Sequence, residues 1–222
     1  MNLDHAIETL VVGYGYWGPN IVRNVAERPE FKLAGLCERD ERRLDDFRSR
    51  NPGVAYERDL DVALADSSLE AVAIATPPHT HHALVRKALE AGKHVLVEKP
   101  LARTAEEAAD LMTLAEELDL VLMPGHTFLY SPPVTKIRNL IRDGVLGDIH
   151  FITSSRMNLG KYQSDGVVLD LAPHDLSILL HWLDEPLVEV TANGRSVYQD
   201  GVHETAFLTL GFRSGTQANV QV

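Results

Sequence analysis

Short apolar runs alternate with segments of helical periodicity over roughly the first half of the chain. Apolar runs between turn signals are typical of buried strands, and apolar residues repeating every three to four positions are typical of amphipathic helices. The expected strands cover residues 7–12, 31–37, 71–75, 94–97 and 120–123, and the expected helices cover residues 17–28, 41–50, 79–91 and 104–118. Strands separated by helices of this length predict right-handed crossovers, and therefore an α/β domain with a doubly wound parallel sheet over residues 1–123.

The pattern changes after Pro124. A helix is expected over residues 132–142 and another over residues 173–183, among strand-like segments at residues 148–157, 187–193, 204–212 and 216–222. This order predicts an α+β domain over residues 124–222, with a mostly antiparallel open sheet. The last segment alternates polar and apolar residues and no closing element follows it, so we expect this domain to be incomplete. An open sheet is normally covered by a neighbour, which predicts a dimer or tetramer and a role in substrate binding and oligomerisation.

Composition and charge narrow the class of protein. The net charge of −11 argues against a nucleic-acid partner, because such binding relies on basic patches. No stretch approaches the roughly 20 apolar residues that a membrane span requires, and the first residues lack the pattern of a secretory signal. The single cysteine, Cys37, indicates a reducing compartment and is expected to be a buried structural thiol. We therefore expect a cytoplasmic protein without a membrane or nucleic-acid partner.

A glycine-rich turn follows the first apolar run. Gly13, Gly15 and Gly18 form a G-x-G-x-x-G pattern directly after a strand and directly before a helix, which is the context of a dinucleotide-binding turn. The glycines permit a tight turn and a close backbone approach to a pyrophosphate at the helix N-terminus. We expect Tyr16 and Trp17, which lie inside the turn, to contact the cofactor as well. The alternative is a purely structural turn.

Glu38 lies at the end of the next expected strand. The interval from Gly18 to Glu38 is 38 − 18 = 20 residues, at which an acidic residue usually meets the adenosine ribose. A glutamate there can accept hydrogen bonds from both ribose hydroxyls and repel a 2′-phosphate, which favours NAD. Arg39 is the complication, because a neighbouring arginine can hold the 2′-phosphate of NADP, so NADP stays possible.

Two further strand ends carry candidate residues. The stiff loop Thr76-Pro77-Pro78-His79-Thr80-His81 is expected to form a wall beside the nicotinamide, with Thr76, Pro77, His79 and His81 as cofactor contacts. Together with His82 these histidines suggest a metal site, but no acidic or cysteine residue accompanies them, so helix-start residues are the favoured interpretation and no metal is predicted.

The third strand-end motif is Glu98-Lys99-Pro100, at the carboxyl end of an expected parallel strand, where α/β sheets place their ligands. Both Glu98 and Lys99 are expected near the cofactor. An ammonium group there can stabilise a developing alkoxide, whereas the alternative for Lys99 is a solvated strand end.

Asp170 and His174 are four residues apart, so they share a face if the segment is helical. A histidine held by a carboxylate can take the proton of a hydroxyl while hydride leaves the carbon. The alternative is a helix-capping aspartate and a packed histidine.

Asn158, with Arg156 and Lys161 nearby, is a candidate substrate contact in a polar stretch that could equally be a solvated loop. A dinucleotide site, a lysine and a carboxylate–histidine pair are the parts that hydride transfer from a carbinol requires.

Together these motifs resemble the glucose-fructose oxidoreductase/inositol dehydrogenase (Gfo/Idh/MocA) family. The matching segments are VVGYGYWGPN, ATPPHTHHAL, AGKHVLVEKPLA, GHTFLYSP and DLAPHDLSIL, from about Leu10 to Leu180. Their forms look most like the branch acting on nucleotide-linked sugars, such as UDP-N-acetylglucosamine or UDP-N-acetylglucosaminuronate 3-dehydrogenases. The resemblance implies a small-molecule sugar or nucleotide-sugar substrate.

The resemblance also implies roles for single residues. Lys99 would contact the reacting hydroxyl and the nicotinamide region, His174 would accept the proton and Asp170 would pair with it; these three would also bind substrate. The bond before Pro100 would be cis. Two departures stand out: many relatives carry a tryptophan where this chain has Leu169, and family members are typically longer.

The motifs are compatible with three functions. The first is an NAD-dependent oxidoreductase that takes a hydride from a sugar carbinol. The second runs the same chemistry in reverse, as an NADPH-dependent ketoreductase of deoxysugar biosynthesis. The third is a non-catalytic dinucleotide-binding regulator, against which the joint presence of Lys99, Asp170 and His174 argues.

Overall fold

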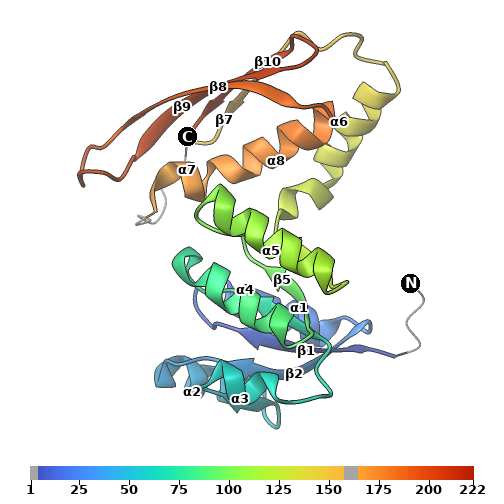
Figure 1. Ribbon diagram of the computed structural model, residues 1–222, viewed down its shortest axis with the longest axis vertical. Helices are drawn as coiled ribbons and strands as arrows, with labels where there is room; N and C mark the ends of the chain where they lie inside the picture. Colours follow the sequence, from blue (N-terminus) through green and yellow to red (C-terminus); the bar gives the residue numbers. More distant parts are fainter. Residues whose placement is uncertain (1–4, 158–164) are drawn as a thin grey trace. The chain divides into compact units, whose positions relative to one another are not determined.

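The computed structural model describes residues 5–157 and 165–222. The chain divides into two compact units, unit 1 (Met1–Gly125) and unit 2 (His126–Val222) (Figure 1). The sequence pattern placed this division between residues 123 and 124. Each unit has its own sheet and its own hydrophobic core.

Unit 1 is built on a six-stranded sheet with the order β3-β2-β1-β4-β5-β6, in which every pairing is parallel. The strands are β1 (Ile7–Val12), β2 (Phe31–Cys37), β3 (Ala55–Glu57), β4 (Ala71–Ile74), β5 (His94–Val97) and β6 (Leu122–Pro124). β3 has three residues, too few to show a periodicity, and was not predicted. The strand order reverses between β1 and β4, and ligands of open α/β sheets bind at such a switch point, beyond the carboxyl ends of the strands.

Helices cover both faces of this sheet. They are α1 (Gly18–Glu27), α2 (Glu41–Arg50), α3 (Leu60–Leu64), α4 (His81–Glu90), α5 (Ala105–Glu117) and a 3₁₀ turn, η1 (Pro78–Thr80). Along β1, Leu10 and Val12 pack in one core cluster with α4 and α5, and Val11 packs in the other with α1 and α2. This burial on both faces explains why β1 reads as a continuous apolar run. The short α3 was not predicted.

Capping residues define two of these helices. The Thr104 side chain accepts a hydrogen bond from the backbone N–H of Glu107 at 3.2 Å, which confirms the expected start of α5. Gly92 follows α4 with φ +74°, the left-handed conformation that a glycine adopts at no steric cost.

Unit 2 contains a four-stranded mixed sheet with the order β7-β10-β9-β8. Its strands are β7 (Phe151–Ser155), β8 (Leu187–Arg195), β9 (Thr205–Phe212) and β10 (Gln217–Gln221), and its helices are η2 (Thr127–Tyr130), α6 (Pro132–Arg142), α7 (Gly166–Asp170) and α8 (Ala172–Leu183). β9 pairs antiparallel with both neighbours, whereas β10 and β7 are parallel. β7 is shorter than the expected strand over residues 148–157, and α7 was not predicted.

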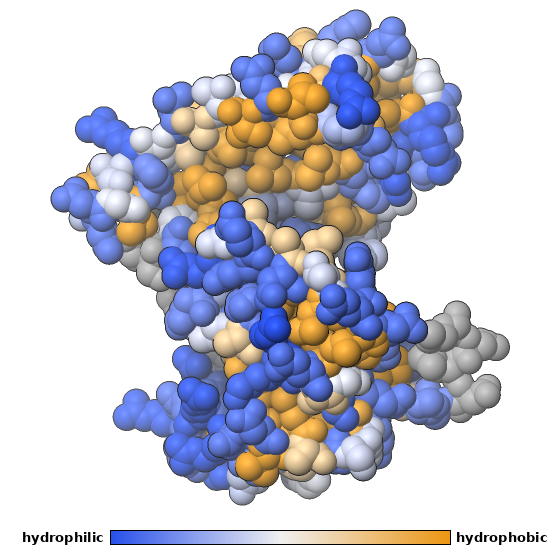
Figure 2. Space-filling view, viewed as in Figure 1, coloured by the Kyte–Doolittle hydropathy of each residue, from blue (hydrophilic) through white to orange (hydrophobic). Residues whose placement is uncertain are grey.

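The sheet of unit 2 is covered unevenly. Along β9 every second side chain is buried, and Leu208 and Leu210 pack with Leu179 of α8. β8, in contrast, is exposed along its whole length. Figure 2 shows hydrophobic residues gathered over the part of unit 2 that holds β8 and α8, and the exposed apolar side chains there include Val188 and Val190. The role of this domain in oligomerisation stays a prediction.

Among the described residues, no helix is long and apolar enough to cross a membrane.

Candidate active site

The glycine-rich turn after β1 requires two of its glycines for steric reasons within the protein. Gly13 has φ +94°, and a Cβ on it would lie 2.8 Å from the Ala75 carbonyl oxygen. A Cβ on Gly18 would clash with the carbonyl oxygen of Gly13. Gly15 differs, because a Cβ there would meet only an Arg43 nitrogen, at 3.8 Å. Packing therefore explains the first and third glycines, while the space over Gly15 is open to a ligand.

The helix that follows the turn has an uncapped N-terminus. No side chain caps the first turn of α1, and that turn contains Pro19 and no acidic residue. Free N–H groups and the positive end of the helix dipole attract anions, and phosphate groups above all. Two residues of the turn itself are exposed, Tyr16 at 88% and Trp17 at 43%.

Glu38 binds the turn itself. Its carboxylate is buried and accepts backbone N–H groups of Tyr14 at 2.7 Å, Arg39 at 2.8 Å and Asp40 at 3.0 Å. Arg43 lies 3.6 Å from the same carboxylate. A carboxylate has about four lone-pair sites, so these contacts leave it little free accepting capacity. The acid expected to meet a ribose also holds the glycine-rich turn against β2.

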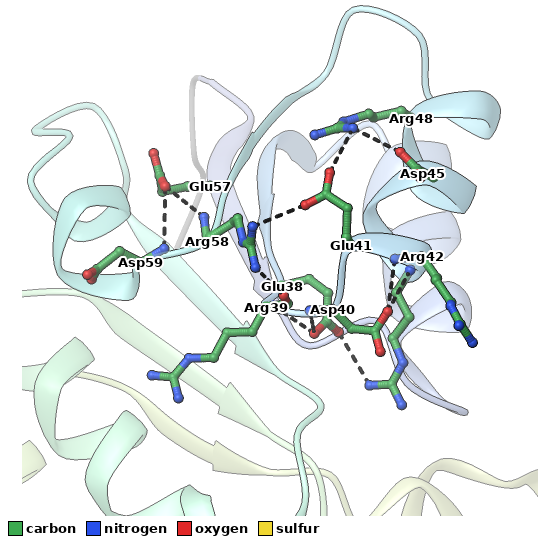
Figure 3. A network of polar contacts seen from close by, with 11 residues as sticks. Glu38, Arg39, Asp40, Glu41, Arg42, Asp45, Arg48, Glu57, Arg58 and Asp59 are labelled. Atoms are coloured by element: carbon green, nitrogen blue, oxygen red, sulfur yellow. Dashed lines mark hydrogen bonds and ion pairs between the residues drawn. The ribbon is translucent and has the colours of Figure 1, made fainter.

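Several arginine side chains lie near Glu38 (Figure 3). The exposed Arg39 side chain extends away from Glu38, and Arg58 donates to the Arg39 carbonyl oxygen at 3.0 Å and pairs with Glu41 at 3.2 Å. Arg58 on the exposed side and Glu38 on the buried side therefore both form hydrogen bonds with the loop after β2. Arg39 itself points to solvent, where a 2′-phosphate could reach it.

Glu98, at the end of β5, connects to the glycine-rich turn. The Trp17 side chain lies close enough to its carboxylate to lower the pKa of Glu98. Burial raises the pKa of Glu98, and the backbone N–H and positive charge of Lys99 partly oppose that rise, as does Trp17. Gly125 packs directly on Glu98, since a Cβ there would lie 3.3 Å from the carboxylate. The ends of β1 and β5 are thus joined within unit 1.

His81 joins two further loops. Its Nδ1 lies 2.7 Å from the Pro100 carbonyl oxygen, and its Nε2 lies 2.8 Å from the Thr76 carbonyl oxygen. The residue is 1% exposed. Both ring nitrogens face backbone carbonyl oxygens, and the contact of His81 with the cofactor stays a prediction. In contrast, Pro77 and His79 are exposed.

Lys99 and Thr76 occupy the positions expected of them at the ends of β5 and β4. Both are half-buried, and the Thr76 hydroxyl lies 2.7 Å from that of Thr80. The Lys99–Pro100 peptide bond is cis, as the family resemblance implied. Within the described residues no group of three or more His, Cys, Asp or Glu side chains could hold a metal ion.

In unit 2, His174 belongs to a chain of side-chain contacts. Its ring packs edge-on against Phe128 of η2, with centroids 4.8 Å apart. The Arg156 guanidinium lies 4.6 Å from the centre of the same Phe128 ring and pairs with Asp175 at 2.6 Å. Asp175 is 5% exposed and also accepts from the Ser154 hydroxyl at 2.7 Å. Arg156, considered above as a substrate contact, is thus committed to the residue after His174.

Asp170 ends α7, and His174 lies in the first turn of α8, with Leu171 between the two helices in right-handed helical conformation. Both side chains are half-buried. Asn158, with Lys161, lies outside the described residues. Phe128 and Asp175 were not predicted as site residues, although both lie inside the GHTFLYSP and DLAPHDLSIL segments that carried the family resemblance.

Comparison with known proteins connects this geometry to a family. Residues 7–126 match the family model described as "Oxidoreductase family, NAD-binding Rossmann fold", and residues 134–222 match the "GFO/IDH/MocA C-terminal domain". The two matches meet near the division between unit 1 and unit 2.

Named relatives include sugar-nucleotide enzymes. The chain is 31% identical over 217 residues to UDP-N-acetylglucosamine 3-dehydrogenase of Acidithiobacillus ferrooxidans, covering 96% of this chain and 66% of that protein. It is 28% identical to dTDP-3,4-didehydro-2,6-dideoxy-alpha-D-glucose 3-reductase of Saccharopolyspora spinosa, covering 86% of this chain and 60% of that protein. The chain spans between 53% and 65% of the length of the first three curated relatives it matches.

Solved structures agree in fold. GenD2 from gentamicin A biosynthesis, in complex with NAD, superposes with a TM-score of 0.93 at 27% identity, covering all of this chain and 67% of that one. The structure of UDP-N-acetylglucosamine 3-dehydrogenase from A. ferrooxidans superposes with a TM-score of 0.85 at 28% identity, covering 97% of this chain and 66% of that one. The predicted architecture of a parallel sheet followed by a mostly antiparallel sheet is confirmed, with β7 and β10 as the one parallel pair of the second sheet. The chain belongs to the Gfo/Idh/MocA family of oxidoreductases, in which the N-terminal domain is an NAD-binding Rossmann fold.

Proposed function

We propose that the protein oxidises a secondary hydroxyl of a nucleotide-linked sugar with NAD as the hydride acceptor. The observation that supports this most is the joining of the loops after β1, β4 and β5 at one edge of the sheet. Trp17 of the glycine-rich turn lies near Glu98, and His81 connects Thr76 to Pro100, the neighbour of Lys99. The backbone on either side of Lys99 is thereby held at the sheet edge that also carries the glycine-rich turn.

The residues present fit a dinucleotide. The open space over Gly15 and the uncapped, acid-free N-terminus of α1 suit a pyrophosphate, and the exposed Tyr16 and Trp17 can contact it. When bound, NAD supplies the oxidised nicotinamide ring that accepts a hydride. Thr76, Pro77 and His79 line the loop proposed to face that ring.

Two side chains would carry the proton chemistry. We assign to Lys99 the stabilisation of negative charge on the substrate oxygen as the C–H bond breaks, because its ammonium is a donor at a strand end. We assign to His174 the role of accepting the hydroxyl proton, and to Asp170 the orientation of His174. The proton leaves the hydroxyl for the imidazole, the carbon loses a hydride, and the product is a ketone. Asn158 is a further proposed substrate contact.

The substrate class rests on relatives. UDP-N-acetylglucosamine 3-dehydrogenase is 31% identical over nearly the whole chain. To test the proposal, the purified protein is mixed with NAD and a panel of UDP-sugars while the near-ultraviolet absorbance of reduced nicotinamide is followed. Growth of that band with one sugar supports the assignment, and a flat trace with every sugar contradicts it.

A second candidate is reduction of a ketosugar with NADPH. It is favoured by the similarity to a dTDP-ketosugar 3-reductase and by the exposed Arg39 beside a Glu38 whose carboxylate is turned to the glycine-rich turn. Replacing Arg39 with Ala separates the two candidates. A fall in NADPH affinity with unchanged NADH affinity supports the reductase, and equal affinities before and after favour the NAD enzyme.

A further inference from the structure

We propose that His81 is a positioning residue, which holds the loop of Lys99 and the loop of Thr76 at a fixed separation through its two ring nitrogens. The proposal rests on the function assigned to Lys99 above. Its basis is the pair of contacts from one imidazole to the Pro100 carbonyl oxygen at 2.7 Å and to the Thr76 carbonyl oxygen at 2.8 Å.

The chemistry of these contacts is specific to a two-nitrogen ring. Carbonyl oxygens only accept, so each contact is a hydrogen bond when the ring nitrogen facing it carries a proton. A neutral imidazole donates to one loop at a time, and an imidazolium donates to both. At 1% exposure, water cannot replace either bond. Loss of the ring would therefore remove the donor that the Thr76 and Pro100 carbonyl groups share.

The ring is attached to a rigid support. His81 is the first residue of α4, and Val85, Ala88 and Leu89 of that helix are all fully buried in the core of unit 1. The two loops, in contrast, contain little regular structure. A fixed helix thus sets the position of two strand-end segments.

The clamped carbonyl groups belong to the residues that matter for the proposed reaction. Pro100 is bonded directly to Lys99, and Thr76 is the first residue of the loop proposed to face the nicotinamide. Glu98 fixes the other side of Lys99, through its N–H to the Ile74 carbonyl oxygen at 2.9 Å. Lys99 therefore lies between two fixed points, of which His81 supplies one.

His82 offers a matched control. It is the next residue of the same helix and also a histidine, but its Nε2 bonds the exposed Asp110 at 2.7 Å and contacts neither loop by a hydrogen bond that we observe. The variants His81→Phe, His81→Gln and His82→Gln thus distinguish the loss of the two carbonyl contacts of His81 from the loss of any histidine at the start of α4. The amide of His81→Gln keeps a donor and guards against a phenylalanine variant that does not fold.

The first arm measures amide hydrogen exchange by mass spectrometry and needs no turnover. In His81→Phe, exchange in peptides covering residues 76–80 and 98–102 should accelerate by about tenfold, with the peptide covering residues 13–18 unchanged. His81→Gln should fall between wild type and His81→Phe, and His82→Gln should match wild type. Unchanged exchange in the two loops, or equal acceleration throughout unit 1, overturns the proposal.

The second arm measures turnover and the binding of ADP-ribose, which lacks the nicotinamide. His81→Phe and His81→Gln should lower kcat by up to about 10²-fold while KM and ADP-ribose affinity change by about twofold or less. Loosened loops with unchanged kcat would overturn the positioning role. A wild-type protein without activity on any sugar would refute the proposed function instead, and the exchange result would still decide whether His81 clamps the loops.

Discussion

In unit 1, Glu38 and His81 are held by backbone groups, whereas in unit 2 His174 packs against a side chain. Glu38 accepts three backbone N–H groups, and His81 contacts two backbone carbonyl oxygens. His174, in contrast, packs on the Phe128 ring, which in turn lies against the Arg156 guanidinium.

The difference follows from the two folds. At the carboxyl edge of a parallel sheet, several strands end together and expose backbone groups that need partners, so one polar side chain can fix two loops. In unit 2 the face of the sheet lies against a helix, and side chains meet there. The position of two loops in unit 1 depends on a single side chain, that of His81. The position of His174 in unit 2 depends on every side chain in the series of contacts around it.

The largest expected effect tests whether each unit contributes a reacting group. Replacing His174 with Asn should lower kcat by about 10²- to 10⁴-fold, because a general base is lost, and Lys99→Met should cause a loss of about 10²- to 10³-fold. NAD affinity, measured by calorimetry, should be little changed in His174→Asn. A His174→Asn variant with wild-type kcat would remove the catalytic assignment in unit 2.

The next effect concerns the buried ion pair between Arg156 and Asp175, next to His174 in the sequence. Replacing Asp175 with Asn leaves the Arg156 guanidinium without a charged partner at a site where the carboxylate is 6% exposed, and should lower the free energy of unfolding of unit 2 by about 3 kcal/mol. The measurement is amide exchange in α8 and β7. Asp143→Asn, at an exposed ion pair of the same unit, is the control and should change stability by less than about 0.5 kcal/mol. Equal effects of the two substitutions would contradict the stabilising role of the Arg156–Asp175 pair.

A smaller effect tests Phe128. Replacing Phe128 with Leu removes the edge-on contact with His174 and the cation–π contact with Arg156, which together are expected to contribute about 1–2 kcal/mol to the stability of unit 2. Tyr130→Leu, at an exposed aromatic residue of the same 3₁₀ turn, should leave the stability of unit 2 unchanged.

The smallest effect sharpens the comparison by reporting on unit 1 alone. Burial raises the pKa of the Cys37 thiol to about 11, with a further contribution from Glu57. Because the thiolate is the reactive form, alkylation at pH 8 should require opening of unit 1, so its rate measures the stability of that unit. Asp175→Asn should leave this rate unchanged.

The same thiol predicts a pH dependence with a definite sign. The folded-state pKa lies above the unfolded value, so the folded protein holds the proton more tightly. The resulting stabilisation is complete below about pH 9 and is lost as the pH rises toward 11. A Cys37→Ala variant should lack this alkaline loss in a denaturation series, and an identical loss in the variant would contradict the assignment.

Much of unit 1 was predictable because its signals are local. The glycine-rich turn, the 20-residue interval to Glu38, and the helix start at Thr104 each lie within short stretches of sequence, and each has a direct steric or hydrogen-bonding cause. The 3-residue β3 and 5-residue α3 were missed because elements of that length show no periodicity. In unit 2, α7 was missed for the same reason.

By itself, the sequence determined the family, the two-part architecture and the identity of the chemical groups, because periodicity, glycine sterics and charge are properties of short segments. Only the tertiary structure decided how those groups are held. His81 was predicted from its place at a helix start, and the structure buries its ring between two carbonyl oxygens, 5 and 19 residues away along the chain. Arg156 looked like a substrate contact and is paired with Asp175, 19 residues away. Such partners are set by how strands and helices pack, and no local pattern in the chain encodes the distance between them.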